Sequence, residues 1–347
     1  MRFPRRQADT DSISFPHQFR IARSRPLLVL ALVAMPGLFA QNPAVAQTAY
    51  PTKPVRLVVS YAAGNVTDLL ARIIAEKLSE KWDQPVTVDN RAGQGGSLGA
   101  QIVAKAPADG YTLLFSAMAA LAINPHVYPN VGYDALKDFA PIVNVAYPSL
   151  AIVIDPSLKI TSFKALVDYS KANPKALNYG TAGNGTVPHL NMEALKIQTG
   201  LIAQHVPYKS APAVTTDVIG GRLQIQQEAL SVVLPHVKAG RLTVLAAGAT
   251  KRLPQLPEVP SLNELVPGFV AVTPWLGILG PAGTPASIAA KINQDVHAIL
   301  LQPDVLEKLA ANGLTATNEG PEAFTRSLVN DYERLGKLVK QLAIKVD

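Results

Sequence analysis

"VRLVVSYAAGNVTDLLAR", residues 55–72, has the pattern of a strand, a short loop and a helix. The apolar run 55–59 has the length of a strand, and apolar residues over 67–81 recur on one helical face. The predicted helix begins near Thr67, whose side chain could cap free backbone N–H groups. Those N–H groups and the helix dipole favour a carboxylate or a phosphate. The alternative is a loop that only turns a strand into a helix, with Asp68 interacting with the dipole.

The same alternation continues along the chain. A strand over 86–90, a helix over 97–106 and a strand over 111–116 complete a βαβαβ order, which predicts a parallel, doubly wound sheet. A second series starts near residue 150. It predicts strands at 150–156, 177–183, 203–208, 223–230 and 242–250, helices at 162–173, 188–199 and 212–219, and tail helices at 286–300, 303–312 and 321–340. Two α/β units predict a ligand cleft at the carboxyl ends of their strands.

The composition fits an exported two-domain protein. The 347 residues are 48% hydrophobic and 16% charged. Arginines precede the apolar run 26–40, and "AVA" (44–46) offers the small residues that a signal peptidase reads, so we expect cleavage near Ala46 and a periplasmic location. A membrane anchor is the alternative, but the run is short and contains Pro36.

Charge and cysteine content exclude several classes. Residues 1–46 hold six arginines and two aspartates, so their removal lowers the net charge from +7 to +3. The remaining chain has no basic cluster that would indicate nucleic acid binding. The sequence has no cysteine, which excludes disulfides, thiolate nucleophiles, lipoprotein-type anchoring and Cys-based metal sites.

"NYGTAGNGTVPHL" (178–190) is the strongest local signal for a ligand loop. Its glycines let a ligand approach the backbone, and its Thr and Asn side chains offer uncharged donors that suit a small carboxylate. An ordinary polar loop is the alternative. The glycine-rich segment 90–100 lacks dinucleotide spacing, because Leu98 stands where a third glycine is needed.

No pattern indicates bond-breaking chemistry. The histidines at 126, 189, 205, 236 and 297 lack metal-ligand spacing, and they are expected to be surface or packing residues. There is no G-x-S-x-G elbow and no paired-carboxylate motif. We therefore predict no catalytic residue, no metal and no cofactor, and a protein that is not an enzyme.

The chain resembles the extracytoplasmic solute receptors of tripartite tricarboxylate transporters, the Bug receptors, from about residue 50 onward. Matching segments include "YPTKPVRLVV", "TDLLARIIAEKLSEKW", "QPVTVDNRAGQGGSLGA", "PADGYTLLF", "AINPHVY", "LNYGTAGNGT", "HVPYK", "GGRLQI", "LPHVKAGRLTVLA" and "PWLGILGPAGTP". The resemblance implies the α/β type II periplasmic-binding-protein fold, with two doubly wound domains, a cleft between them and two strands that cross from one to the other. It implies domain 1 from 47–149 plus 268–347 and domain 2 from 150–267, after a signal peptide over 1–46.

The resemblance also implies a function. Such a receptor closes around a small carboxylate held by backbone donors and bridging waters, and delivers it to the membrane permease subunits of the transporter. It implies a monomer with no nucleic acid partner. Two alternatives remain: an orphan receptor that signals to a sensor protein, and an enzyme on the same scaffold.

Departures from the family pattern predict the pocket. The family's first loop usually has the form F-A-P-G-G-G-T-D, and here Asn65 and Val66 replace two glycines. The loop 116–125 has lost most hydroxyls and the histidine, and Glu228 stands where an acidic residue often faces the cleft. We expect a narrow, apolar first-domain wall that suits an apolar or aromatic monocarboxylate better than citrate, unless these side chains point away.

The loops and the resemblance together give one set of candidate ligand-binding residues. They are Tyr61, Ala63, Gly64, Asn65, Val66, Thr67, Ser116, Ala117, Met118, Thr181, Ala182, Gly183, Asn184, Gly185, Thr186, Tyr208 and Glu228.

Overall fold

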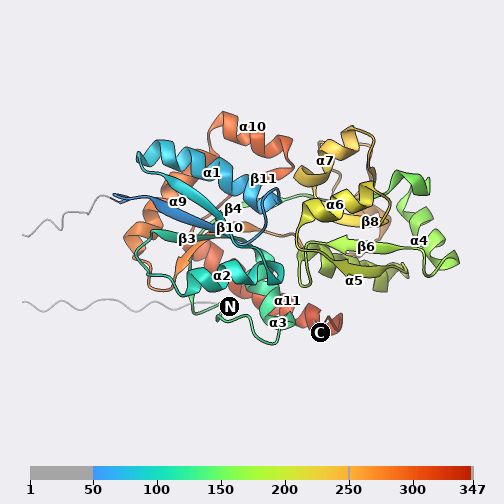
Figure 1. Cartoon of the computed structure of the whole chain (residues 1–347), viewed down its shortest axis with the longest axis horizontal. Coiled ribbons are helices and arrows are strands. Elements are labelled where there is room, and N and C mark those ends of the chain that lie inside the picture. The colour runs from blue at the N-terminus through green and yellow to red at the C-terminus, as the bar shows by residue number, and fades with distance from the viewer. Residues whose placement is uncertain (1–49, 249–250, 345–347) are drawn as a thin grey trace, which may run out of the picture. The chain divides into compact units, whose positions relative to one another are not determined.

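The computed structural model describes residues 50–248 and 251–344 (Figure 1). The predicted signal peptide lies outside the described residues. Within them, no helix combines the length and the apolar character needed to cross a membrane.

The first sheet has six strands in the order β11-β4-β10-β3-β1-β2. Its strands are β1 (Val55–Val59), β2 (Val86–Asn90), β3 (Thr112–Ala117), β4 (Phe139–Pro148), β10 (Leu276–Pro281) and β11 (Leu314–Glu319). Strand β1 runs parallel to β2 and β3, as predicted. The remaining strands of this sheet are antiparallel: β10 lies antiparallel between β3 and β4, and β11 is antiparallel to β4.

The second sheet has five strands in the order β7-β6-β8-β5-β9. They are β5 (Leu150–Ile154), β6 (Asn178–Thr181), β7 (Gln204–Pro207), β8 (Ile225–Ala229) and β9 (Thr243–Ala247), all within the predicted segments. Strand β6 is parallel to β7 and β8, whereas β5 is antiparallel to β8 and β9. Both sheets are therefore mixed.

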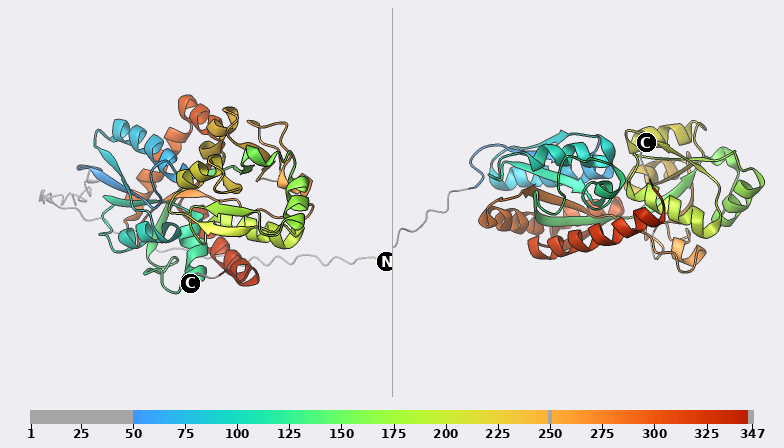
Figure 2. Two further views of the ribbon diagram at one scale, coloured as in Figure 1. Left: turned by 45° about the vertical axis from the view of Figure 1, so that its right-hand side comes forward. Right: turned by 90° about the horizontal axis from the view of Figure 1, so that it is seen from below.

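Helices cover both sheets, and we call each sheet with its helices a lobe. The first lobe has α1 (Val66–Trp82), α2 (Ser97–Ala104), α3 (Asn124–Val127), α9 (Ala286–Leu300), α10 (Pro303–Ala311) and α11 (Pro321–Gln341). The second has α4 (Phe163–Ala172), α5 (Val187–Thr199), α6 (Ala211–Ile219), α7 (Leu230–Lys238) and α8 (Leu262–Leu265). Short turns of helix lie at η1 (Gln94–Gly96), η2 (Ala119–Ile123) and η3 (Pro156–Leu158). Figure 1 and the right-hand view of Figure 2 both show the middle of the chain, green to yellow, gathered apart from the blue and red ends.

The chain passes between the lobes twice. Strand β4 leads through Ser149 directly into β5, and residues 248–275 connect β9 back to β10. The ends of these strands lie where the two lobes meet. Residues of the crossing segments can therefore line a site between the lobes.

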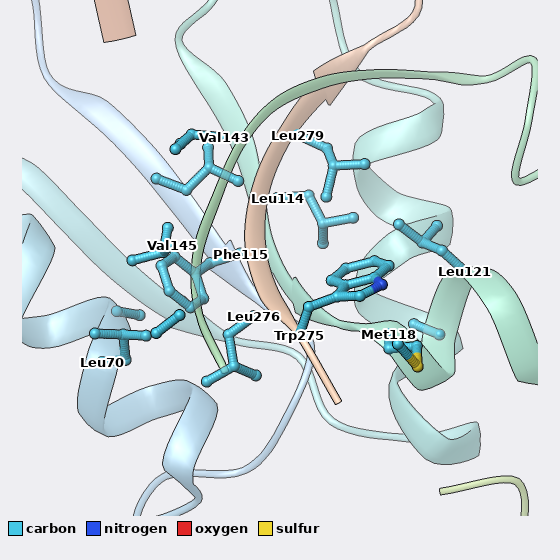
Figure 3. Close-up of a cluster of buried hydrophobic side chains, with 14 of the residues drawn as sticks. Leu70, Leu114, Phe115, Met118, Leu121, Val143, Val145, Trp275, Leu276 and Leu279 are labelled. Carbon is cyan, nitrogen blue, oxygen red and sulfur yellow. The ribbon is translucent and has the colours of Figure 1, made fainter. Parts of the chain in front are cut away.

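The close packing of β10 on α11 ties the tail of the chain to the first sheet. A Cβ atom on Gly277 would lie 2.4 Å from Cζ of Phe324 and 3.0 Å from the Val143 carbonyl oxygen. The Phe324 ring packs edge-on against Trp275, with ring centroids 4.9 Å apart. Figure 3 shows part of this core, with Trp275 and Phe115 labelled. Glycine at 277 is therefore what allows α11 to approach the central antiparallel strand.

Substitution of Gly277 tests this contact. We expect Gly277→Ala to lower the free energy of unfolding by about 1–3 kcal/mol, because the added methyl group overpacks the core against Phe324. Urea-induced unfolding measures the change. In a Phe324→Leu background the cost of Gly277→Ala should be smaller; equal costs in both backgrounds would show that the ring is not the obstacle.

Candidate functional site

An inner cavity of about 50 Å³ lies where the two lobes meet. The first lobe contributes the β1–α1 loop and the end of β3, and the second contributes the β6–α5 loop and the end of β8. Its lining residues are Tyr61, Asn65, Val66, Thr67, Ala117, Ala119, Pro148, Leu150, Ala182, Thr186, Val187, Pro188, Glu228, Ala229, Pro274 and Leu276. The N-termini of α1 and α5 therefore converge on one small, mostly apolar space.

Asn65, not Thr67, caps α1. The backbone N–H of Thr67 donates to Oδ1 of Asn65 at 3.0 Å, and Asn65 has the extended backbone of an N-cap residue, with φ −76° and ψ 157°. The prediction that Thr67 is the cap is wrong because the helix begins one residue earlier, at Val66. Asn65 and Thr67 both line the cavity, and neither the Asn65 Nδ2 group nor the Thr67 hydroxyl has a hydrogen-bond partner among residues 50–248 and 251–344.

Asp68 faces away from the cavity. Its carboxylate accepts hydrogen bonds from the Gly64 N–H and from Asn90, both at 3.0 Å, and forms an ion pair with Arg72. Burial opposes ionisation, but the hydrogen bonds from Arg72, Gly64 and Asn90 prevail and lower the pKa of Asp68. The negative charge of Asp68 is therefore neutralised by groups of the first lobe. This agrees with its expected role in the first turn of the helix.

Glu228 is the one carboxylate in the inner cavity lining. The side chain is only 4% exposed, and its Oε1 accepts a hydrogen bond from the Ala229 N–H at 2.8 Å. Burial raises the pKa of Glu228 to about 7, although the Ala229 N–H and the Gln226 side chain favour the ionised form. Near neutral pH this carboxyl group is therefore distributed between its charged and neutral forms.

A stacked pair of histidines supports the glycine-rich loop of the second lobe. The His189 and His205 rings lie 3.9 Å apart between centroids, at an angle of 15°. Nδ1 of His189 accepts from the Gly185 N–H at 3.2 Å, and Nε2 of His205 is hydrogen-bonded to the Thr181 hydroxyl at 2.7 Å. The hydroxyl groups of Thr181 and Thr186 both donate to the Gly183 carbonyl oxygen at 3.0 Å. The loop conformation is thus fixed by its own polar groups and by two imidazoles beneath it.

Burial keeps both imidazoles neutral. Burial and, to a lesser extent, the charge of Lys196 lower the pKa of His189 to about 4. Burial and the neighbouring His189 lower the pKa of His205 to about 3. His189 can accept a hydrogen bond at Nδ1 only while that nitrogen is unprotonated.

An outer chamber of about 570 Å³ adjoins the inner cavity. The two spaces share Tyr61 and Ala182 in their linings. The outer chamber is lined by Tyr61, Ala62, Ala92, Gly93, Gln94, Gly95, Gly96, Tyr128, Ala182, Gly183, Asn184, Pro207, Tyr208, Lys209 and Ser210. Its walls are turns and loops of both lobes.

The structure brings most of the predicted site residues to these two spaces. The inner cavity takes Tyr61, Asn65, Val66, Thr67, Ala117, Ala182, Thr186 and Glu228, and the outer chamber adds Gly183, Asn184 and Tyr208.

The other predicted site residues, Ala63, Gly64, Ser116, Met118, Thr181 and Gly185, line neither space. Ser116 is buried against Ser60, with the two hydroxyl oxygens 2.7 Å apart, and Thr181 is directed toward His205. Met118 is buried in the core. Ala63 and Gly64 are exposed, and Gly185 packs against Asn124.

Much of the apolar lining was not predicted from the sequence. Pro148, Leu150, Ala229, Pro274 and Leu276 come from strand ends and from the segments that cross between the lobes, and they belong to no local motif. Ala119 lies in the loop 116–125, which was expected to form part of the wall. Val187 and Pro188 could have been found, because they directly follow the candidate loop at the start of the predicted helix.

Comparison with known proteins identifies the family. The model of the tripartite tricarboxylate transporter family receptor matches residues 70–344. The chain belongs to this family. The resemblance to Bug receptors is confirmed: the receptor is 33% identical to BugT of Bordetella pertussis over 321 residues, which cover 91% of this chain and 98% of that protein. It is 32% identical over 334 residues to a Pseudomonas sp. (strain P51) protein from the tcbD–tcbE intergenic region, covering 96% and 98% of the two chains.

Solved structures confirm the type II periplasmic-binding-protein fold of this receptor. The R. palustris protein Rpa4515 with adipate is 34% identical, with a TM-score of 0.83, over 86% of this chain and 100% of that one. The periplasmic binding protein BugD is 28% identical, with a TM-score of 0.81, over the same shares. MatC from Rhodopseudomonas palustris with bound malate is 26% identical, with a TM-score of 0.79, over 84% and 100%.

The histidine pair gives this receptor a predictable acid sensitivity. The pKa of His189 is about 4 in the fold, against an ordinary value near 6.5, so the unfolded chain binds more protons between these values. The free energy of unfolding should therefore fall as pH decreases from 6.5 to 4, with His189 contributing about 3 kcal/mol. Above pH 6.5 this contribution is constant. Urea titrations at several pH values should show a shallower fall for His189→Gln than for His297→Gln on α9; the same slope in both would contradict the assignment.

Proposed function

We propose that this receptor captures a small carboxylate in the inner cavity by closure of its two lobes and delivers it to the permease of a tripartite tricarboxylate-type transporter. One observation carries the proposal: Asn65 and Thr67, whose Nδ2 and hydroxyl groups have no hydrogen-bond partner in the described chain, line a partly open cavity at the N-terminus of α1. The relatives with adipate and malate support a carboxylate ligand.

The cavity suits a carboxylate held without a cationic side chain. Neither lysine nor arginine is among its lining residues. Helices α1 and α5 have 17 and 13 residues, long enough for their dipoles to favour negative charge at the N-termini that converge here. The mostly apolar lining, with Val66, Ala117 and Leu276, lowers the local polarity and so strengthens each hydrogen bond made there. This supports the expected narrow, apolar first-lobe wall.

The wider context follows the family. We propose a periplasmic monomer, exported by a signal peptide cleaved near Ala46, with domain 1 from 47–149 plus 268–347 and domain 2 from 150–267. The inner cavity lining contains no nucleophile beside a base, and Glu228 is its one carboxylate, so we propose binding without turnover. A ligand recovered unchanged after incubation with the protein, as seen by NMR, would agree with a receptor and not with an enzyme.

Substitutions at the α1 N-terminus test the carboxylate site. Asn65→Asp keeps a good helix cap but replaces the Nδ2 donor with a second carboxylate oxygen. We expect carboxylate affinity to fall by at least about tenfold, with little change in thermal stability. Thr67→Val removes the hydroxyl at nearly constant volume and should also cost about tenfold.

Isothermal titration with acetate, adipate and malate measures these losses. Thr87→Val on the exposed side of β2 is the matched control, and its affinity should equal that of the unmodified protein. Unchanged binding by both Asn65→Asp and Thr67→Val would place the ligand elsewhere.

The pKa of Glu228 predicts how binding depends on pH. Because the group titrates at about 7, it becomes negatively charged as pH rises from 6 to 8, and it then repels a carboxylate in the same cavity. We expect affinity to weaken by about tenfold over this range. Glu228→Gln should remove the dependence, whereas the control Glu307→Gln on α10 should keep it. A pH-independent affinity in the unmodified protein would show that Glu228 does not face the ligand.

A further inference from the structure

A buried asparagine of the second lobe holds the segment by which the chain returns to the first lobe. Residues 270–275 of this segment belong to no helix or strand. Nδ2 of Asn191, on α5, donates to the Val272 carbonyl oxygen at 3.1 Å, and Oδ1 of Asn191 accepts from the Val272 N–H at 2.8 Å. Asn191 and Val272 are both buried. One amide side chain therefore satisfies both backbone groups of Val272, and we call this pair of bonds the Asn191 clamp.

Trp275 ties the same segment to the first lobe, three residues further along the chain. Its carbonyl oxygen accepts from the Met118 N–H at 3.0 Å, and its indole N–H donates to Oδ2 of Asp331, on α11, at 3.1 Å. Its ring is buried against Phe324. Two residues, 273 and 274, thus separate an anchor on the second lobe from an anchor on the first.

These two residues have few torsions with which to change the angle between the lobes. Neither Thr273 nor Pro274 makes a backbone hydrogen bond with any residue that the structure describes. The proline ring fixes φ of Pro274, and it also restricts Thr273 to extended conformations. Pro274 lines the inner cavity as well, so a movement of this short link moves part of the cavity wall.

The first passage is held in a similar way at Ser149, but by backbone groups. The Ser149 N–H donates to the Gly313 carbonyl oxygen, between α10 and β11 of the first lobe, at 2.8 Å. The Ser149 carbonyl oxygen accepts from the N–H of Leu230, on α7 of the second lobe, at 2.8 Å. Because the clamp at the second passage is a side chain, a substitution can remove it and leave the first passage unchanged.

We propose that Asn191 is a positioning residue for ligand binding, because its clamp confines the pivot of the second passage to Thr273 and Pro274. The clamp also joins two parts of the inner cavity wall: Asn191 lies one helical turn after Val187, and Val272 lies two residues before Pro274. The inference rests on the proposed function, in which the lobes close around a ligand.

Loss of the clamp lengthens the pivot. The backbones of residues 270 and 271 also make no hydrogen bond within the described chain, so without the clamp the free part of the segment runs from 270 to 274. The lobes of the unliganded protein then sample more arrangements, and a smaller fraction of the molecules has the cavity wall assembled. The apparent affinity falls with that fraction.

Asn191→Leu removes both hydrogen bonds at similar side-chain size. We expect a lower thermal midpoint, because the Val272 N–H and carbonyl oxygen are left buried without a partner. We also expect binding of acetate, adipate and malate to weaken by about five- to tenfold in isothermal titration. Gln198→Leu is the matched control. Gln198 lies on the same helix and donates to the Pro267 carbonyl oxygen of the same segment at 3.3 Å, but it is exposed, and its loss should leave affinity unchanged.

Distances between the lobes give a readout that a merely structural role would not change. The chain has no cysteine, so spin labels attach only at introduced ones. Glu76→Cys on α1 and Lys171→Cys on α4 place labels at exposed positions of the two lobes. Asn191→Leu should broaden the distance distribution of the unliganded protein, and Gln198→Leu should not.

A second variant tests the pivot if Asn191→Leu does not fold. Thr273 is exposed and lies outside the inner cavity lining, so Thr273→Gly loosens the pivot without touching the clamp or the ligand. It should broaden the distribution and weaken binding by about threefold or more. Val270→Gly, exposed in the same segment but beyond the clamp, is its control and should behave as the unmodified protein.

The outcomes separate this inference from the proposed function. A folded Asn191→Leu protein with a lower thermal midpoint but unchanged affinity and distances overturns the positioning role, as does a Thr273→Gly protein that behaves like Val270→Gly. If the unmodified protein binds none of the three acids, the proposed carboxylate ligand fails, and the distance distributions still decide whether the clamp confines the pivot. Weaker binding with a broader distribution supports both.

Discussion

The direct approach of two backbone turns, one from each lobe, sets the width of the cleft. A Cβ atom on Gly95 would lie 2.7 Å from the Asn184 carbonyl oxygen, and one on Gly185 would lie 2.5 Å from Oδ1 of Asn124. Both glycines have positive φ, +58° and +74°, which other residues adopt at a cost. Asn124 fixes the first turn by donating to the Gln94 and Gly95 carbonyl oxygens at 2.9 Å. Gly95 and Asn184 both line the outer chamber, so this contact between the lobes forms part of its wall.

Some polar groups near the cavity are hydrogen-bonded within the protein, and others have no partner among the described residues. In the second lobe the hydroxyls of Thr181 and Thr186 both donate to the Gly183 carbonyl oxygen, and the Gly185 N–H donates to Nδ1 of His189. In the first lobe Asn65 supports the helix with one end of its amide and offers the other to the cavity. The unpartnered side-chain donors therefore belong to the first lobe, whereas hydrogen bonds within the second lobe fix the conformation of its loop.

Local patterns were sufficient for elements whose partners are close in sequence. The strand 55–59 and the helix after it agree with the structure within one residue, because strand periodicity, loop and helix face lie in one window. The antiparallel strands β4, β10 and β11 were missed, because strand direction depends on pairing between segments over a hundred residues apart. The same limit applies to the site. Loops rich in hydrogen-bond donors could be found from the sequence. Pro148 and Pro274 line the cavity because the chain crosses between the lobes there, which no local pattern indicates.

Asn65 and Val66 stand where the family pattern has two glycines, and their side chains change the first-lobe loop. Asn65 has φ −76°, which every residue type adopts, so a glycine was not required at this point of the backbone. A side chain here stiffens the loop in the unbound protein and reduces the conformational entropy that binding must remove. The helix cap also fixes the orientation of the Asn65 amide, because Oδ1 accepts from the Thr67 N–H at 3.0 Å. Asn65 and Val66 both line the inner cavity, so their side chains take up space at the N-terminus of α1 that two glycines would leave free.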